Sequence, residues 1–345
     1  MPTWFFTFFC LSVLLMPHTC KGAGDNASAI VSQMRPLLHT FVEIKAWGDG
    51  AHEAIEAAFA EMSRINDLLN NYDPASEVSR INAAAGEKPV TISPETMDAL
   101  RTAIRFCELS GGAFDITVGP LLKFWGFAQE EPGMFGHEPD RRAIRKAKKL
   151  VDYRAIELTE VQKEGGAFTY CARLKRPGMW IDVGAFSKGY VADRAMEVLG
   201  ARGITNMLIS AGGTICARGK KPDGSPWMVA VRHPRKEDSF LTFVKLSDAS
   251  ISTSGDYERF YEHEGKRRGH IIDPRSGMPV ERMQSVSVIA RSGVESDALS
   301  TALFVLGPEK GIALIEKLPD ASALLITQQG EIVMSRKWPQ RTVFY

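Results

Sequence analysis

Asp297 and Thr301 offer two oxygen ligands on one face of a predicted helix. Residues four apart lie one turn from each other on the same helical surface. Ser296 fits an N-cap position, the apolar run 302–306 follows, and Gly307-Pro308 would end the helix. A carboxylate and a hydroxyl suit Mg²⁺, which prefers oxygen and keeps water or phosphate in its other positions. On this segment alone, the structural explanation is favoured: an Asp stabilised by the helix dipole and a Thr bonded to its own backbone.

Two glycine-containing loops have residue types that suit a planar, anionic ligand. In the segment 111–121, paired glycines allow close backbone approach, and Phe114 beside Asp115 could grip a heterocycle by stacking and hydrogen bonding. In the segment 181–190, a turn leads into a helix with Lys188 in its first turn, which suits phosphate. The Walker spacing is absent. Taken singly, a helix cap before a buried turn and a plain strand-to-helix turn explain these segments equally well.

Two further loops combine glycine with hydroxyl groups. Residues 210–214 form a strand followed by a glycine turn, which by itself could be a simple bend. Residues 252–257 present hydroxyls and a Gly turn that could donate to phosphate oxygens. In the segment 269–277, His270 could act as a general acid or base near neutral pH, although a lone His is more often structural.

The elements that must position these loops follow from periodicity and capping signals. Helices are predicted from Ile55 to Leu69, from Pro94 to the stop at Gly111, and over 187–199. Strands are predicted over 40–47, 179–183, 207–210, 227–231, 240–246, 286–290 and 323–327. Because the strands of the second half do not alternate regularly with helices, we expect an α+β fold with mixed, mostly antiparallel sheets and packed helices.

The composition is that of an ordinary soluble globular chain, with 345 residues, 44% hydrophobic residues and a net charge of +1. This charge gives no reason to expect nucleic-acid binding. The basic cluster within 141–149 is interleaved with Ile144 and Ala147 at helical spacing, so we interpret it as the solvated face of a surface helix, with a phosphate or lipid patch as the alternative. The charge-rich stretch 128–150 is the best candidate for a flexible insertion.

Three scattered cysteines are expected to be buried apolar fillers: Cys107, Cys171 and Cys216.

Residues 1–22 are predicted to be a signal peptide, which leaves 23–345 as the mature domain. The apolar run Trp4–Met16 is shorter than the roughly 20 residues that a spanning helix needs. No Lys or Arg precedes the run, so the usual cationic start is missing. Cys20 is a candidate site for lipid attachment, but residues 17–19 match the lipoprotein pattern poorly. We therefore expect export to the periplasmic side of the inner membrane, with a lipid anchor at Cys20 left open.

Five motifs occur together in this chain, and in this order they resemble the ApbE family of FAD:protein FMN transferases. They are GGAFDITVGPL (111–121), KGYVAD (188–193), STSGDY (252–257), HIIDPRSG (270–277) and DALST (297–301). The resemblance runs from about Leu38 to Gly307. It implies an ApbE-like fold with a flavin cleft between two subdomains.

The resemblance also implies a Mg²⁺-dependent reaction that attaches the FMN half of FAD to a Thr or Ser of an acceptor flavoprotein and releases AMP. The acceptor would be a subunit of a membrane respiratory complex. By position, the metal ligands would be Ala185, Asp297 and Thr301, and His270 would transfer the proton. FAD would contact Leu38, Tyr72, Ala113, Phe114, Asp115, Asp182, Lys188 and Ile271.

The chain departs from the family pattern in three places. Leu38-His39-Thr40 replaces Met-Gly-Thr, Asn70-Asn71 precedes Tyr72, and Thr214 replaces the Asp of Gly-Gly-Asp. These changes touch the expected flavin contacts and leave the expected metal ligands intact. Two other functions stay open at this stage. One is an FAD pyrophosphatase that releases free FMN and AMP, and the other is an exported, non-catalytic FAD-binding protein.

Overall fold

The computed structural model describes residues 29–128, 139–163, 165–263 and 265–339, so the predicted signal peptide and Cys20 lie outside the described residues. Within these ranges the largest element is a sheet of eight strands in which every neighbouring pair is antiparallel. In spatial order the strands are β1 (Val31–Leu37), β2 (Thr40–Trp47), β6 (Asn206–Ala211), β7 (Thr214–Arg218), β10 (Ala249–Gly255), β15 (Met283–Ala290), β16 (Ser322–Thr327) and β17 (Ile332–Met334). The expected α+β class is confirmed.

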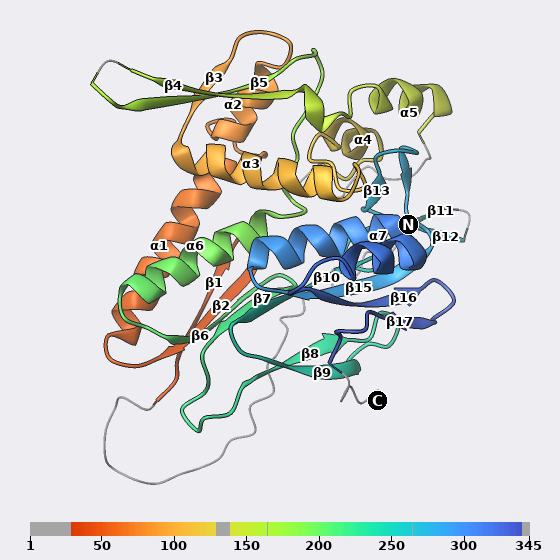
Figure 1. Cartoon of the computed structure of the whole chain (residues 1–345). Coiled ribbons are helices and arrows are strands. Elements are labelled where there is room, and N and C mark those ends of the chain that lie inside the picture. Colours follow the sequence, from red (N-terminus) through yellow and green to blue (C-terminus); the bar gives the residue numbers. More distant parts are fainter. Residues whose placement is uncertain (1–28, 129–138, 164, 264, 340–345) are drawn as a thin grey trace, which may run out of the picture.

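Three helices cover one face of this sheet (Figure 1). They are α1 (Ala51–Leu69), α6 (Ser187–Ala201) and α7 (Gly293–Ile315). Helix α1 buries Ile55, Phe59 and Met62 in the main core, as its spacing predicts. Helix α7 is long and apolar enough to cross a membrane, but 56% of its apolar window is buried within the fold, as expected of a central core helix.

Both ends of the segment predicted around Asp297 differ from expectation. Helix α7 begins one turn earlier, with Ser292 as the N-cap that accepts from the backbone of Glu295, and Ser296 is buried inside the helix. Gly307 interrupts the helix with a positive φ of 76°, and after Pro308 a second helical part continues to Ile315. The predicted N-cap was therefore wrong by one turn, and the predicted stop is a kink.

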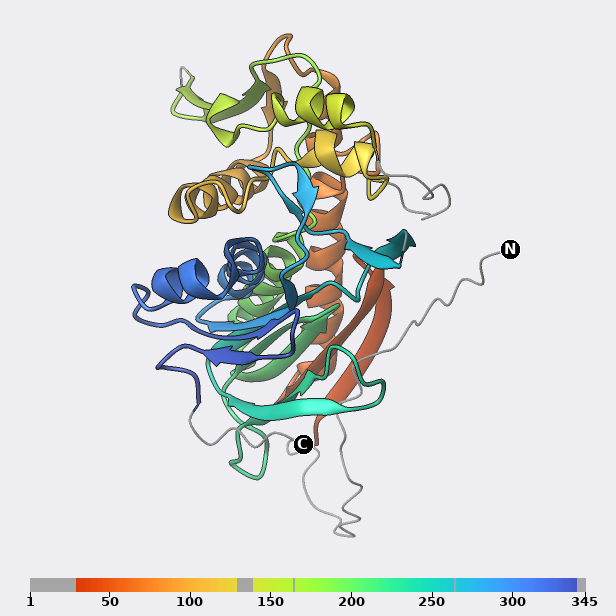
Figure 2. The ribbon, with the colours of Figure 1, turned by 90° about the vertical axis from the view of Figure 1, so that its right-hand side faces the viewer.

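A two-stranded ribbon covers the opposite face of the sheet (Figure 2). It consists of β8 (Trp227–Arg232) and β9 (Phe240–Leu246), which pair antiparallel. Its inward residues Trp227, Val229 and Val244 form a second core with Leu208 and Ile215 of the sheet. Both faces of the sheet are thus buried, which explains why its central strands are almost wholly apolar or small.

An upper layer lies above the three helices (Figure 1). It contains α2 (Glu77–Ala83), α3 (Pro94–Leu109), the small sheet β3 (Val90–Ile92), β5 (Phe168–Leu174) and β4 (Ile156–Gln162), and the 3-10 turn η2 (Tyr153–Ala155). Ser93 caps α3 by accepting from the backbone N–H of Thr96, as predicted. The predicted strand 179–183 forms only a single bridge, between Trp180 and Val118, so that prediction was wrong.

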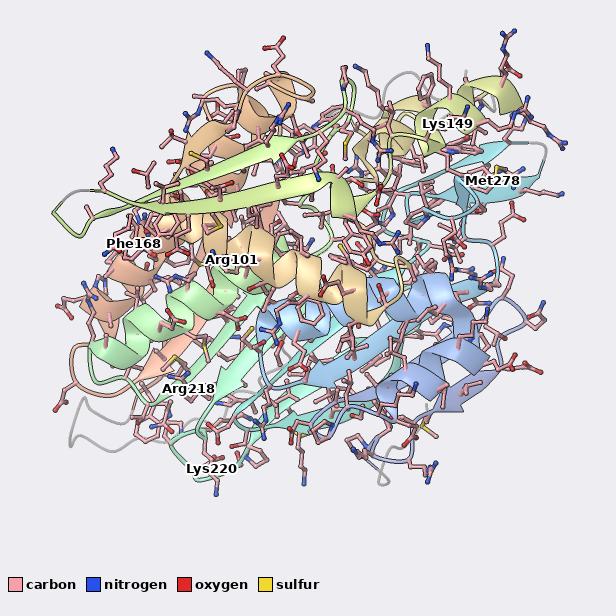
Figure 3. All side chains as sticks on the ribbon, turned by 45° about the horizontal axis from the view of Figure 1, so that its top comes forward. Arg101, Lys149, Phe168, Arg218, Lys220 and Met278 are labelled. Carbon is pink, nitrogen blue, oxygen red and sulfur yellow. The ribbon has the colours of Figure 1, made fainter. Side chains whose placement is uncertain are left out.

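A third core joins short elements at one end of the upper layer. They are α4 (Gly119–Phe124), α5 (Arg141–Lys148), the hairpin β11 (Phe260–His263) with β12 (Lys266–Gly269), and the hairpin β13 (Ile272–Asp273) with β14 (Met278–Pro279). Ile144 and Ala147 anchor α5 in this core, while all six cations of 141–149 are exposed. Figure 3 shows Lys149 at the same corner as Met278 of β14. The basic segment is therefore a surface helix, as predicted, and residues 129–138 of the suggested insertion lie outside the described residues.

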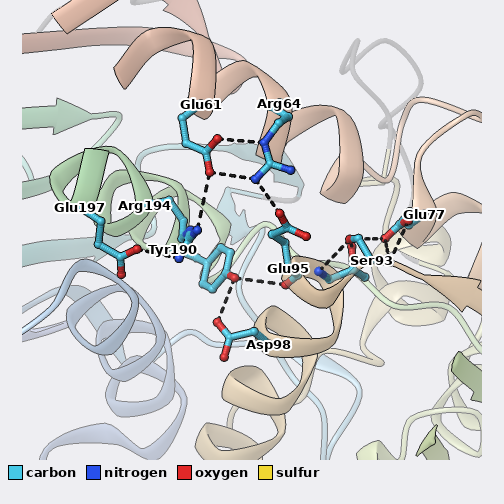
Figure 4. Close-up of polar contacts among 10 residues, drawn as sticks. Glu61, Arg64, Glu77, Ser93, Glu95, Asp98, Tyr190, Arg194 and Glu197 are labelled. Carbon is cyan, nitrogen blue, oxygen red and sulfur yellow. Dashed lines mark hydrogen bonds and ion pairs between the residues drawn. The ribbon is translucent and has the colours of Figure 1, made fainter. Parts of the chain in front are cut away.

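A polar network ties the upper layer to the helices below it (Figure 4). Arg64 of α1 pairs with Glu61 at 2.8 Å and with Glu95 of α3 at 2.7 Å. The hydroxyl of Tyr190 on α6 lies 3.1 Å from the carbonyl oxygen of Glu95 and 3.0 Å from the carboxylate of Asp98. These contacts connect α1, α3 and α6, and so help to hold the residues of the upper layer over the start of α6.

Helices α6 and α7 touch backbone to backbone near their first turns. A Cβ added to Gly189 would lie 2.1 Å from the carbonyl oxygen of Gly293, and one added to Gly293 would lie 2.6 Å from the carbonyl oxygen of Gly189. Real Cβ atoms do not approach an oxygen so closely, so this crossing requires glycine on both helices.

We expect Thr242→Val to stabilise the protein by about 1 kcal/mol. The Thr242 side chain is 0% exposed, and its hydroxyl has no hydrogen-bond partner in the described part of the chain. Urea unfolding measures the change. Thr96→Val is the matched control, because Thr96 is equally buried but its hydroxyl accepts from Ser93, so this variant should lose stability. A destabilised Thr242→Val would contradict the assignment of an unsatisfied hydroxyl.

We expect Gly189→Ala to lower the free energy of unfolding by about 3 kcal/mol, because the new methyl group must push the two helices apart. Gly200→Ala in the same helix is the control. Its Cβ would meet only the flexible end of Arg218, so helix propensity should leave it as stable as the wild type or slightly more stable. Equal stability of both variants in urea would refute the close crossing.

Candidate functional site

Asp297 lies where α6 and α7 cross. Its Oδ2 accepts a hydrogen bond from the backbone N–H of Gly189 at 3.0 Å, and its side chain is buried. Burial raises the pKa of this carboxyl, while Lys188, the Gly189 N–H and a hydrogen bond from Thr214 oppose the rise. A carboxylate kept from water at a helix start is a position where a bound cation would restore lost electrostatic stabilisation.

The turn that contains Ala185 is held in place just before α6. Gly184 donates from its N–H to Asp182 at 2.9 Å, and Lys188 donates from Nζ to the carbonyl oxygen of Gly184 at 3.1 Å. Ala185 lies just before the N-cap of α6 and four residues before Gly189, the residue whose N–H donates to Asp297. The predicted ligands Ala185 and Asp297 therefore come from neighbouring parts of one junction.

Thr301, the third predicted metal ligand, follows Asp297 by one turn of α7. Its Oγ1 lies 3.2 Å from Oγ of Ser254 on β10. Together, a carboxylate, a hydroxyl and a backbone carbonyl form the kind of oxygen donor set that suits Mg²⁺. The described residues contain no cluster of three or more His, Cys, Asp or Glu side chains that could hold a metal.

Asp182 joins the first and second glycine loops. Its N–H donates to the carbonyl oxygen of Ile116 at 2.7 Å, which sets 113–117 beside the turn before α6. Its carboxylate accepts from the side chain of Asn71 at 3.2 Å. Burial raises the pKa of Asp182, and the Gly184 N–H, Arg259, Asn71 and Lys188 lower it. Asn71 is a contact that sequence reasoning noted only as a departure from the family pattern.

Phe114 and Asp115 point into the protein. The ring of Phe114 is buried in the main core and packs edge-on against Phe186, so the suggested stacking on a heterocycle is excluded in this structure. Asp115 accepts from the N–H and hydroxyl of Thr117 and from the N–H of Tyr153. Ala113 is also buried. The three residues shape the loop from within, and their contact with FAD stays a prediction.

Leu38 and His39 form the two-residue turn between β1 and β2, with φ of 56° and 55°. Such a turn favours Gly or Asn, so two larger side chains in the left-handed region are strained. The His39 ring lies edge-on to Tyr72 at 5.3 Å. The structure thus brings the predicted flavin contacts Leu38 and Tyr72 to one place, and it shows how this chain uses the position where the family has Gly.

His270 follows β12, next to buried Ile271, and is half-buried. Its Nδ1 lies 3.2 Å from the carbonyl oxygen of Arg259, which favours the tautomer with a proton on Nδ1 and a free lone pair on Nε2. Burial, with Arg259 as the next cause, lowers the pKa of His270 to about 4. Its imidazole is therefore neutral near pH 7 and able to accept a proton.

Lys188 is the electrostatic centre of the junction. It is close enough to affect the pKa of Asp182, Glu258, His270 and Asp297. Desolvation raises the pKa of Glu258, and Arg232 and Lys188 lower it. Sequence reasoning missed Glu258, Arg259 and Arg232. The motif STSGDY ends immediately before Glu258, which was the available signal.

A cavity of about 380 Å³ lies beside the junction and not at it. Its lining includes Asp193, Cys216, Ser250 and Gly293, at the first turn of α7. Cys216 is a free, buried thiol, like Cys107, and Cys171 is free and half-buried, so the expectation of buried fillers is confirmed for two of the three. None of the predicted flavin or metal residues is among the residues that line this cavity.

We expect His270 to make the protein more stable at pH 7 than at pH 5. The unfolded chain binds a proton at His below about pH 6.5, but the folded chain does so only below about 4. The contribution is therefore fully present above about 6.5 and is lost as the pH falls towards 4. Urea unfolding at both pH values should give a smaller difference for His270→Gln than for the wild type. An unchanged difference would contradict the lowered pKa.

Comparison with known proteins gives consistent matches along the chain. The model of the ApbE family matches residues 38–325. A protein of Klebsiella pneumoniae named FAD:protein FMN transferase is 32% identical over 99% of this chain and 97% of its own length. One of the same name from Escherichia coli K12 is 32% identical over 84% of this chain and 80% of its own length.

Solved structures show the same fold. The ApbE protein of Thermotoga maritima superposes with a TM-score of 0.79 at 30% identity, covering 89% of this chain and 97% of its own. The apo form of the flavinyl transferase ApbE from Pseudomonas stutzeri gives a TM-score of 0.76 at 30% identity, covering 89% and 94%. With its motifs gathered around one helix crossing and this likeness over most of its length, the chain belongs to the ApbE family.

Proposed function

We propose that this protein is an FAD:protein FMN transferase. It moves FMN from FAD to a Thr or Ser hydroxyl of an acceptor flavoprotein, with Mg²⁺ bound at Ala185, Asp297 and Thr301, and it releases AMP. The observation that supports this most is the contact between Asp297 and the start of α6, directly beside Lys188. The names of the relatives point to the same activity.

The chemistry needs a site that neutralises a diphosphate. Mg²⁺, when bound, would supply charge neutralisation to the phosphate oxygens. The chain adds the cation of Lys188 and the positive end of the α6 dipole, which favour anions. Such charge neutralisation and positioning supply most of the catalysis in phosphoryl transfer. On the proposed function, FAD contacts Leu38, Tyr72, the loop 113–115, Asp182, Lys188 and Ile271.

His270 accepts the proton of the acceptor hydroxyl at Nε2. The hydroxyl oxygen forms a bond to the phosphorus of the FMN half, and the bond from that phosphorus to the oxygen of the AMP half breaks. The carbonyl oxygen of Arg259 orients the imidazole, which is neutral near pH 7 and therefore has a lone pair on Nε2 for the proton. The signal predicted in residues 1–22 supports a reaction on the periplasmic side of the inner membrane. Membership of the ApbE family favours a respiratory flavoprotein subunit as the acceptor.

The purified protein, incubated with FAD, Mg²⁺ and a candidate acceptor flavoprotein subunit, should give a covalently fluorescent acceptor. Mass spectrometry should find FMN on one Thr or Ser. Asp297→Asn should lower the rate about 100-fold or more, because it removes the carboxylate from the proposed metal site. Asp49→Asn is the matched control, since Asp49 is exposed in the loop between β2 and α1.

Two outcomes would contradict the proposed transferase and favour another function. Release of AMP with no labelled acceptor would favour an FAD pyrophosphatase. Binding of FAD without any turnover, by a protein shown to be folded, would favour a non-catalytic flavin-binding protein.

A further inference from the structure

A row of hydroxyl groups lies between the sheet and α7. It comprises Thr214 of β7, Ser250, Ser252 and Ser254 of β10, and Ser296, Ser300 and Thr301 of α7, and we call it the hydroxyl seam. Alternate residues of a strand share a face, so the three serines of β10 all face the helix. Sequence reasoning assigned the hydroxyls of 252–254 to phosphate. That assignment is wrong for Ser252, whose side chain is 1% exposed and bonded inside the protein.

The seam contains a continuous chain of hydrogen bonds that ends on Asp297. Ser250 lies 2.7 Å from Ser296, and Ser296 lies 2.9 Å from Ser252, between hydroxyl oxygens. Ser252 donates to Thr214 at 2.9 Å. Thr214 is the acceptor in this bond, so its hydroxyl proton can be donated elsewhere. The Thr214 hydroxyl donates it to the carboxylate of Asp297.

The register between β7 and β10 brings these hydroxyl groups together. Ser252 pairs with Thr214 across β10 and β7, and Ser250 pairs with Cys216. Ser250, Ser252, Ser296 and Thr214 are each at most 1% exposed. Water is thereby kept from competing for these bonds, and hydrogen bonds in sequence strengthen one another at low dielectric. Ser254 extends the seam to Thr301, the other proposed metal ligand on α7. Its Oγ lies 2.8 Å from Oγ of Ser300 and 3.2 Å from Oγ1 of Thr301.

We propose that Thr214 is a positioning residue for Asp297, supported from behind by Ser252. The two carboxylate oxygens of Asp297 need one orientation if Oδ2 is to keep the Gly189 N–H while the carboxylate also binds Mg²⁺. Thr214 fixes that orientation from the sheet side. This inference rests on the proposed function, because it assumes a metal at Asp297. It explains how Thr serves at a position where the family pattern has a carboxylate.

The test measures metal affinity without turnover. Mn²⁺ replaces Mg²⁺, and its binding to the whole protein is followed by electron paramagnetic resonance. Thr214→Val, which keeps the shape and removes the hydroxyl, should raise the Mn²⁺ dissociation constant about tenfold, the usual effect of losing one hydrogen bond to a charged group. Thr214→Ser should stay within about twofold of the wild type. Ser252→Ala should raise the constant about threefold.

Ser287→Ala is the matched control. Ser287 is 0% exposed in the same sheet, but its hydroxyl bonds Thr253 at 2.8 Å and is not part of the seam. Its Mn²⁺ affinity should equal that of the wild type. If Thr214→Val does not fold, the Mn²⁺ dissociation constant of Ser252→Ala tests the inference in its place. Wild-type affinity in Thr214→Val, or a loss in Thr214→Ser as large as in Thr214→Val, overturns the inference. A wild-type protein that binds no Mn²⁺ refutes the proposed function itself.

Discussion

The close contact between α6 and α7 is the constraint on which the site depends. Only because Gly189 and Gly293 lack side chains do the two helices approach far enough for Asp297 of one to accept from the backbone of the other. This bond fixes the carboxylate at the start of α6, where Lys188 and the positive end of the helix dipole favour an anion. One geometric requirement thus brings the proposed cation ligand Asp297 next to Lys188, the proposed phosphate contact.

The surrounding layers serve this junction in different ways. The main sheet supports α6 and α7 from below through the main core. The upper layer brings Asp182 against Ile116, and the network through Arg64, Glu95 and Tyr190 holds that layer in place. Asp297, which is buried, half-buried Asp182 and exposed Glu258 all lie near Lys188. Desolvation raises the pKa of each of these carboxyl groups and Lys188 lowers it, together with Arg259 at Asp182 and Arg232 at Glu258, and such opposed shifts mark a functional-site candidate.

The hydroxyl seam is an unusual interface for a core helix, because an apolar contact between β10 and α7 would be simpler to satisfy. A buried hydroxyl without a partner costs free energy, and the seam provides partners only if strand and helix keep one register. Such an interface specifies position more strictly than apolar packing does, since an apolar contact tolerates small shifts. The position it specifies is that of Asp297 and Thr301.

The local patterns of this chain determined a good part of the fold. Alternation defined β2 and β9, and a Ser-Pro start defined α3, because these signals depend on neighbours in sequence. The motifs also identified Asp297, Lys188 and His270 as candidates. Tertiary structure decided the rest. The apolar run 179–183 found no partner strand beyond one bridge, and Ser296 became a core residue because α7 starts a turn earlier.

The direction of each side chain was likewise a tertiary outcome. Phe114 turned into the core, and Thr214 turned towards Asp297, because partners distant in the sequence surround them. Periodicity records which residues share a face of one element. Burial and hydrogen bonding depend on which other element packs against that face, and that is set only when the whole chain folds.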